Sequence, residues 1–325
     1  MFAPRPGEDS PPLRALAGGL DAPVARRAGL ARDLVATARP AQWQKNALLF
    51  AAFVFSAGAS WAWDDPAGWL PLFARASAAF AIFCAAASSA YYLNDVLDVQ
   101  ADRAHPRKRQ RPIAAGRVPV PLALVTAGML LAGALAGAAL LGAAFALVLL
   151  AYVALTAAYS LELKHVVILD VLVVASGFAL RALAGAVAIG VPVSPWLYVV
   201  TTLGALLLAT VKRRQELQLA AGDPAQGRRV LLDYSARFLD QMVGVALAAT
   251  IVAYALYVIS AENLPDDHSM LATLPFVLYG LFRFLLIAER APAHNTDELI
   301  VRDRPLLACM ALFALTALVV LAAHR

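Results

Sequence analysis

The sequence is poor in charged residues and in cysteine, and both shortages narrow the class of protein. Only 15% of the 325 residues are Asp, Glu, Lys or Arg, whereas 61% are hydrophobic. A water-soluble domain of this length carries far more charge. The two cysteines, Cys84 and Cys309, both lie inside apolar runs. The sequence therefore offers neither a disulfide framework nor a CxxC metal site.

Several familiar chemical motifs are also missing. There is no Walker A loop, no GxGxxG turn after a strand, no HExxH and no GxSxG, so the common nucleotide-binding, metalloprotease and serine-hydrolase sites are excluded. No cleavable signal peptide is visible, because residues 1–38 contain scattered Pro, Gly and Arg without a long apolar core. We expect 1–38 to be a basic segment, largely disordered, with an interfacial helix near 30–38.

Long apolar runs occupy most of the remaining chain, 39–325. Each run is long enough to cross a hydrocarbon core of ~30 Å as a helix. The fold class predicted is therefore an all-α polytopic membrane protein with nine transmembrane helices. A tight Gly/Ala turn is expected to join the third to the fourth. The predicted spans are 43–59, 70–93, 119–138, 140–160, 166–189, 196–212, 238–260, 271–288 and 305–323.

The positive charge lies on one side of these spans. With a cytoplasmic N-terminus, the cytoplasmic segments hold 23 of the 27 Lys and Arg residues, and the external loops SWAWDDPAG, GVPVSP and AENLPDDHSM hold none. This pattern predicts a multi-pass protein of a bacterial-type inner (plasma) membrane, with its N-terminus and active site cytoplasmic. Because the basic residues gather at membrane exits, nucleic acid is not an expected partner.

The stretch YYLNDVLDVQADRAHPRKRQRP (91–112) joins an apolar helix to a basic loop. On a helix, Asp95, Asp98 and Asp102 fall within about 60° of one another. Three carboxylates on one face repel each other unless a cation lies between them. Mg²⁺ is bound by such oxygens together with substrate phosphates, so these acids are the predicted catalytic metal ligands, and Asn94 can add an amide contact. Basic residues nearby would bind phosphate oxygens, namely Arg103, Arg107, Lys108 and Arg111.

The pattern N-D-x-x-D-x-x-x-D at the end of the second of nine spans resembles the first aspartate motif of the UbiA superfamily of intramembrane prenyltransferases. The resemblance covers about residues 39–323, and it is nearest to the branch that acts on decaprenyl phosphate as a phosphoribosyltransferase. The narrower match rests on RPAQWQKN, NDVLDVQADRAHPRKRQRPIAAG, YSLELKH, RALAGAVA, KRRQEL and VRDR. The resemblance implies a UbiA-type bundle around a cytoplasm-facing polar cavity. It also implies Mg²⁺-dependent transfer of phosphoribosyl from phosphoribosyl diphosphate to a polyprenyl phosphate.

Further substrate-binding residues are expected in the other cytoplasmic segments. Lys45 lies just inside a span, where an ammonium group needs a polar partner, and we expect that partner to be phosphate. The resemblance places Lys164 in the active-site cavity, and Tyr159 is expected near it. Near KRRQEL, typical members carry a second aspartate motif, but this chain offers mainly basic residues that favour anionic oxygens over a second metal. The expected contacts there are Lys212, Arg213 and Glu216.

Two alternative functions remain open from the sequence. A prenyltransferase that moves a prenyl group to an aromatic or quinone-type acceptor would share the fold and the first aspartate motif, but KRRQEL argues against it. An organic-anion transporter would also contain intramembrane charges, yet the chain shows no inverted repeat. The partners expected are phosphoribosyl diphosphate, a polyprenyl phosphate and a second copy of the chain in a homo-oligomer.

Overall fold

The computed structural model describes residues 22–106, 108–192, 195–222, 229–261, 264–290 and 302–323. Within these ranges the regular structure is helical, apart from one β-bridge between Ala57 and Trp61. The α-helices are α1 (Ala22–Ala38), α2 (Ala51–Phe55), α3 (Pro66–Leu97), α4 (Val99–Ala104), α5 (Val120–Leu141), α6 (Ala143–Leu161), α7 (Leu169–Ile189), α8 (Pro195–Gly222), α9 (Ala236–Ser260), α10 (Leu274–Arg290) and α12 (Arg304–Ala323). The 3₁₀ helices are η1 (Pro40–Phe50), η2 (Lys108–Gln110), η3 (Leu163–His165), η5 (Arg229–Asp233) and η6 (Ser269–Thr273).

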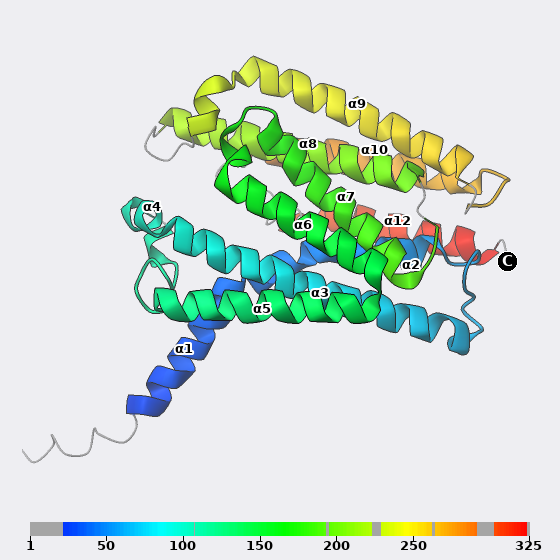
Figure 1. Cartoon of the computed structure of the whole chain (residues 1–325). Helices are drawn as coiled ribbons and strands as arrows, with labels where there is room; N and C mark the ends of the chain where they lie inside the picture. Colours follow the sequence, from blue (N-terminus) through cyan, green and yellow to red (C-terminus); the bar gives the residue numbers. More distant parts are fainter. Residues whose placement is uncertain are drawn as a thin grey trace, which may run out of the picture.

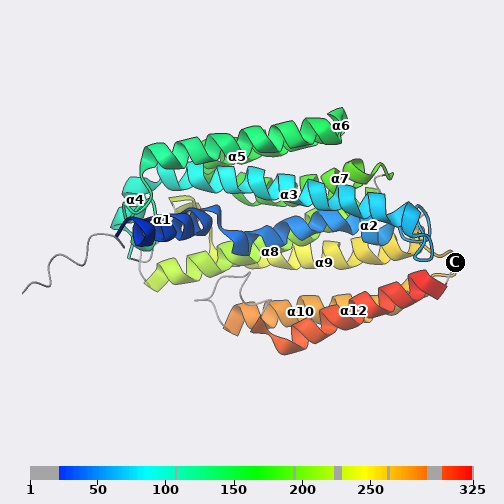
Figure 2. The ribbon, with the colours of Figure 1, turned by 90° about the horizontal axis from the view of Figure 1, so that it is seen from below.

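Eight helices in the described part are long and apolar enough to cross a membrane, which confirms the predicted class of polytopic helical membrane protein. The long helices lie side by side with their axes roughly aligned (Figure 1). Figure 2 shows α5 and α6 along one edge of the bundle and α10 and α12 along the other. One end of the bundle holds the C-terminus of α3, together with α4, η3 and η5, and we call it the aspartate end.

The first predicted span, 43–59, differs most from expectation. In place of one α-helix, the chain forms the 11-residue η1 followed directly by the 5-residue α2. A 3₁₀ helix rises ≈ 2.0 Å per residue and an α-helix 1.5 Å, so the two segments together cover about 30 Å. This pair is therefore long enough to cross the hydrocarbon core, although it lacks an 18-residue α-helix.

A backbone contact fixes η1 against α7. A Cβ atom built on Gly185 would lie 2.1 Å from the carbonyl oxygen of Leu49 and 2.9 Å from its Cα. Leu49 and Ala184 are fully buried in the same apolar cluster. Only glycine allows this approach, so the small-residue stretch of α7 is what lets the two segments pack in direct contact.

We expect Gly185→Ala to destabilise the protein by about 1–3 kcal/mol or more, because the added methyl group forces two backbones apart. Thermal unfolding of the purified protein in detergent measures the loss. Gly133→Ala in α5 is the matched control, since nothing lies within 4 Å of its Cβ position. That variant should be neutral or slightly stabilised. Equal melting temperatures for the two variants would contradict the contact.

The turn between α5 and α6 agrees with the prediction from the sequence, whereas the start of the N-terminal helix differs from it. Gly142 joins α5 to α6 with φ 131°, the tight glycine turn that was predicted. The N-terminal helix α1 begins at Ala22 rather than near residue 30, and its later part packs against the bundle through Leu30, Leu34 and Ala38. Its Leu34 carbonyl accepts a 2.6 Å hydrogen bond from the Tyr92 hydroxyl. Residues 1–21 lie outside the described ranges.

Candidate active site

Asp95, Asp98 and Asp102 lie on a nearly continuous helix. Although α3 ends at Leu97 and α4 begins at Val99, the helical hydrogen bonds continue through the junction. The Asp98 amide donates to the Asn94 carbonyl at 2.9 Å, and the Asp102 amide donates to the Asp98 carbonyl at 2.8 Å. The helical backbone therefore persists across the junction, and Asp95 and Asp102 both lie against Arg111.

Two of these acids converge on one positively charged nitrogen. Arg111 Nη1 lies 3.2 Å from Asp95 Oδ1 and 2.7 Å from Asp102 Oδ2. Both carboxylates are almost fully buried, with 2% of each residue exposed. Arg39 adds a second contact, with its Nη2 2.5 Å from Asp95 Oδ1. Arg39 itself lies over the ring of Tyr91, at 5.0 Å from the centroid, so it is held from two sides.

This arrangement is suited to a magnesium ion. The described residues contain no group of three or more His, Cys, Asp or Glu side chains placed to hold a metal. Mg²⁺ in phosphate-transfer sites, however, needs only one or two carboxylates, because substrate phosphates and water complete its shell. Asp95 and Asp102 both direct an oxygen at the same Arg111 nitrogen, so one cationic group already bridges the two carboxylates.

Asp98 faces a different partner. Its Oδ1 lies 3.4 Å from Lys164 Nζ on η3, and its side chain is 43% exposed, against 3% for Asp95 and Asp102. The Lys164 side chain is 21% exposed. This long and accessible pair contributes little to stability. Lys164 is therefore available to exchange Asp98 for another anion.

A second charged cluster lies between α7 and α8. Arg213 Nε is 2.7 Å from Asp170 Oδ2, and Arg213 also pairs with Glu216 and Tyr159. Asp170 is completely buried and Arg213 is 4% exposed. The arginine is thus committed to two acids inside the bundle. Removing one partner would leave an uncompensated charge buried between α7 and α8, which is costly.

Tyr234 connects this second cluster to the strained start of α7. Its hydroxyl donates to Asp170 Oδ1 at 2.6 Å and accepts from the Ile168 amide at 2.8 Å. Ile168 has φ 71°, a conformation that a β-branched residue rarely adopts. Burial, then the hydrogen bond to Asp170, raises the pKa of Tyr234 to about 12. The neutral phenol is thus the form that the fold stabilises.

We expect Tyr234→Phe to cost about 1–3 kcal/mol, because Asp170 loses a donor and the Ile168 amide loses its acceptor. The stabilisation by this hydroxyl should be fully present below pH 10 and lost as pH rises through about 12, where the folded protein releases the phenol proton. Thermal unfolding as a function of pH measures both effects. Tyr279→Phe is the control, since Tyr279 is 49% exposed. A Tyr234→Phe melting temperature equal to the control's would exclude the role.

The other predicted ligands lie in several places. Asn94 faces a groove between α3, α5 and α6 rather than the Arg111 side. Arg103 is exposed, and its Nε donates to the Ala114 carbonyl at 3.1 Å, which braces the loop after α4. Lys108 is exposed on η2, and Lys212 is exposed on α8.

Lys45 is half-buried on η1, and Tyr159 is half-buried on α6 beside Arg213. Arg107 lies outside the described residues. The structure thus brings Asp95, Asp102 and Arg111 together and sets Arg213 with Glu216 in a separate cluster.

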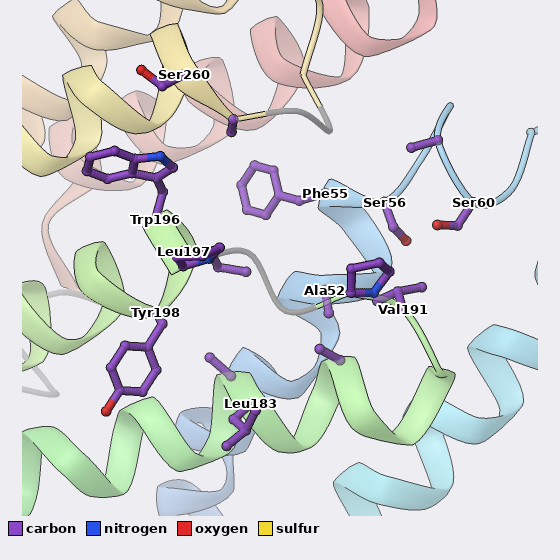
Figure 3. Close-up of a pocket in the computed structure, with 16 residues that line it drawn as sticks. Ala52, Phe55, Ser56, Ser60, Leu183, Val191, Trp196, Leu197, Tyr198 and Ser260 are labelled. Carbon is purple, nitrogen blue, oxygen red and sulfur yellow. The ribbon is translucent and has the colours of Figure 1, made fainter.

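A large cavity lies at the other end of the bundle. It has a volume of about 570 Å³ and is bordered by α2, α7, α8 and the end of α9. Phe55, Trp196 and Tyr198 surround it together with several small residues (Figure 3). None of the lining residues in the described part of the chain is charged.

The comparisons with known proteins agree with this geometry. Residues 45–300 match the family model described as the UbiA prenyltransferase family. A protein of Mycolicibacterium smegmatis named decaprenyl-phosphate phosphoribosyltransferase is 38% identical over 286 residues, which cover 85% of this chain and 88% of that protein. Proteins of the same name from Mycobacterium tuberculosis and Corynebacterium glutamicum are 34% and 33% identical over 279 and 282 residues. The aligned residues cover 86% and 85% of this chain, and 91% and 83% of the two relatives, respectively.

Solved structures show the same fold at lower identity. A UbiA homolog from Archaeoglobus fulgidus bound to GPP and Mg²⁺ superposes with a TM-score of 0.67 at 18% identity, over 89% of this chain and 99% of that one. A structure of digeranylgeranylglyceryl phosphate synthase gives a TM-score of 0.59 at 13% identity, over 90% and 99%. These similarities support the helical arrangement described above.

Proposed function

The chain belongs to the UbiA prenyltransferase family, and from this premise we propose that it transfers 5-phosphoribosyl from phosphoribosyl diphosphate to a polyprenyl phosphate. The products are diphosphate and polyprenylphosphoryl-5-phosphoribose, a precursor of lipid-linked arabinose. The relatives named decaprenyl-phosphate phosphoribosyltransferase support this reaction. The single observation that carries it is the pair Asp95 and Asp102, buried and directed at one cation beside a basic loop.

Asp95 and Asp102 would hold Mg²⁺, whereas Asp98, the third predicted ligand, lies against Lys164. When bound, the ion supplies positive charge to the diphosphate as that group departs. Arg111 and Arg39 already point at the carboxylates. With a metal on the carboxylates, these guanidinium groups would be free to bind phosphate oxygens through several N–H donors.

The proposed transfer of the phosphoribosyl group needs no strong base. An oxygen of the polyprenyl phosphate, already anionic, bonds to ribose C1, while the bond from C1 to the diphosphate breaks and the diphosphate keeps the electron pair. The protein must bring two polyanions together, so neutralising and aligning them is its main contribution. Lys164 supplies charge on the α6–α7 side, opposite the aspartates of α3 and α4.

Prenyl transfer to an aromatic acceptor is the competing reaction in this family. In the described part of α8, the positions after Thr210 provide Lys212, Arg213 and Arg214 with Glu216 as the acid, and Arg213 already binds that acid. A second metal would lack free carboxylates here. We therefore favour a donor whose extra phosphate is bound by basic residues.

A choice of substrates tests the proposal. Purified protein would receive Mg²⁺ with either phosphoribosyl diphosphate and a polyprenyl phosphate, or a prenyl diphosphate and an aromatic acid, and lipid products would be identified by mass. We expect the lipid mass to increase by one phosphoribosyl group in the first mixture and no prenylated acid in the second. Product only in the second mixture would refute the assignment.

We further propose that the aspartate end faces the cytoplasm of a bacterial-type inner membrane, because the Lys- and Arg-rich segments gather there. Phosphoribosyl diphosphate is water-soluble, so the donor would then reach the site from the cytoplasm. A cysteine-accessibility experiment on Lys108→Cys tests this orientation: labelling only after the inner membrane is opened supports it, and labelling from outside contradicts it.

A further inference from the structure

An apolar groove separate from the large cavity lies between α3, α5 and α6. Its volume is about 220 Å³. Small residues of α3 and α6, including Ala86, Ala90 and Ala157, form its floor and one wall, and larger leucines border it. Asn94 lies at one end, on the helix turn that also carries Asp95. The groove and the aspartate cluster therefore occupy different faces of the same helix.

The groove runs from the middle of the bundle to the aspartate end. On α3 its lining extends from Ala86 to Leu97, which at 1.5 Å per residue is about 16 Å, or half of a ~30 Å hydrocarbon core. Leu97, Leu124 and Leu161 border the groove at that end and are 59%, 45% and 63% exposed. The groove is thus open where a lipid headgroup would be.

A positive charge lies at this open end. The 3.4 Å Lys164–Asp98 pair joins the two chain segments that border this open end, since Asp98 directly follows Leu97 and Lys164 is three residues beyond Leu161. The pair is long and partly exposed, which lets Lys164 accept a different anion at little cost.

We propose that this groove binds the part of the polyprenyl phosphate nearest its phosphate, with the phosphate against Lys164. The inference rests on the proposed function and adds where the lipid acceptor is held. Charge complementarity selects this occupant: an apolar chain fills the groove, and an anionic phosphate meets Lys164 beside Asp98. Because the groove covers only half the membrane, the rest of the chain extends into the bilayer, and the site does not measure chain length.

Two neighbouring alanines provide a matched test. Ala157 lines the groove, whereas Ala158 is exposed on α6 and does not line it. Ala157→Trp should fill the groove and raise the KM for a short polyprenyl phosphate at least tenfold, while the KM for phosphoribosyl diphosphate stays within twofold. Ala158→Trp should leave both values within twofold of wild type. Equal lipid KM values for the two variants would overturn the proposal.

A charge test at the mouth does not depend on filling the groove. Leu161 is 63% exposed, so both Leu161→Glu and Leu161→Lys should fold. We expect the Glu variant to weaken binding of the phosphate lipid about tenfold and the Lys variant to retain or strengthen it. No difference between them contradicts a phosphate at this position.

Binding measured without the donor separates this proposal from the proposed function. Native mass spectrometry of the purified protein with a short polyprenyl phosphate, and with phosphatidylglycerol as competitor, reports occupancy directly. Wild-type binding that Ala157→Trp abolishes and phosphatidylglycerol does not displace supports the groove, even if no phosphoribosyl transfer is found. Displacement by phosphatidylglycerol at equal concentration would assign the groove to bilayer lipid and overturn the proposal.

Discussion

Asp95→Asn should lower the rate of phosphoribosyl transfer by about 10²–10³-fold at saturating substrates, the effect of removing one strong electrostatic stabiliser from an active site. The substitution keeps the size of the side chain but removes the negative charge that Arg39 and Arg111 now share. Because a neutral amide binds Mg²⁺ weakly, the concentration of Mg²⁺ needed for half-maximal rate should also rise. Steady-state assays across a Mg²⁺ series measure both changes.

Asp240→Asn is the control for this prediction. Asp240 pairs with Arg214 at the start of α9, and its side chain is 51% exposed. The same chemical change there should alter the rate less than twofold and leave the Mg²⁺ dependence unchanged. If Asp95→Asn and Asp240→Asn behaved alike, Asp95 would have no role in metal binding.

Arg213→Gln should destabilise the folded protein by about 3–5 kcal/mol, the usual cost of breaking a buried ion pair from one side. Without Arg213, the fully buried Asp170 loses its cationic partner. Glu216 loses the same partner but is half-buried and can reach water. Unfolding in detergent, followed by circular dichroism, measures the loss.

The double variant Asp170→Asn/Arg213→Gln provides the decisive comparison. Removing both charges leaves a neutral amide pair, so it should be markedly more stable than Arg213→Gln alone, and a double-mutant cycle gives the coupling energy. Tyr234 can still donate to the remaining amide oxygen at position 170. If the two substitutions were additive, the Asp170–Arg213 pair would not stabilise the α7–α8 contact.

The apolar runs and the aspartate spacing could be predicted because both depend on local sequence. Eight helices follow the predicted spans within a few residues at most ends, and hydrophobic length alone sets them. The α8 helix is the main exception, because it continues to Gly222 beyond the predicted end at residue 212. Residues 213–221 lie past the apolar run and are mostly polar. They contain no Gly or Pro that would end the helix before Gly222.

The partners of the charged residues could not be predicted, because they come from distant segments. Asp95 meets Arg39 across 56 residues, and Asp170 meets Tyr234 across 64. Asp170 did carry a signal, since an acid inside a predicted span requires a partner. Tyr234 carried none. Likewise, the close contact of η1 with α7, in which Gly185 admits the Leu49 carbonyl, joins segments that are far apart in the chain.

Binding of phosphoribosyl diphosphate in the absence of lipid shows whether the aspartate cluster holds the donor. Isothermal titration calorimetry would compare wild-type protein with Mg²⁺, wild-type protein with EDTA, and Asp95→Asn/Asp102→Asn with Mg²⁺. We predict binding in the first case only, because the two buried carboxylates and the ion act together on the diphosphate. Binding of equal strength in all three cases would show that the aspartate cluster does not hold the donor.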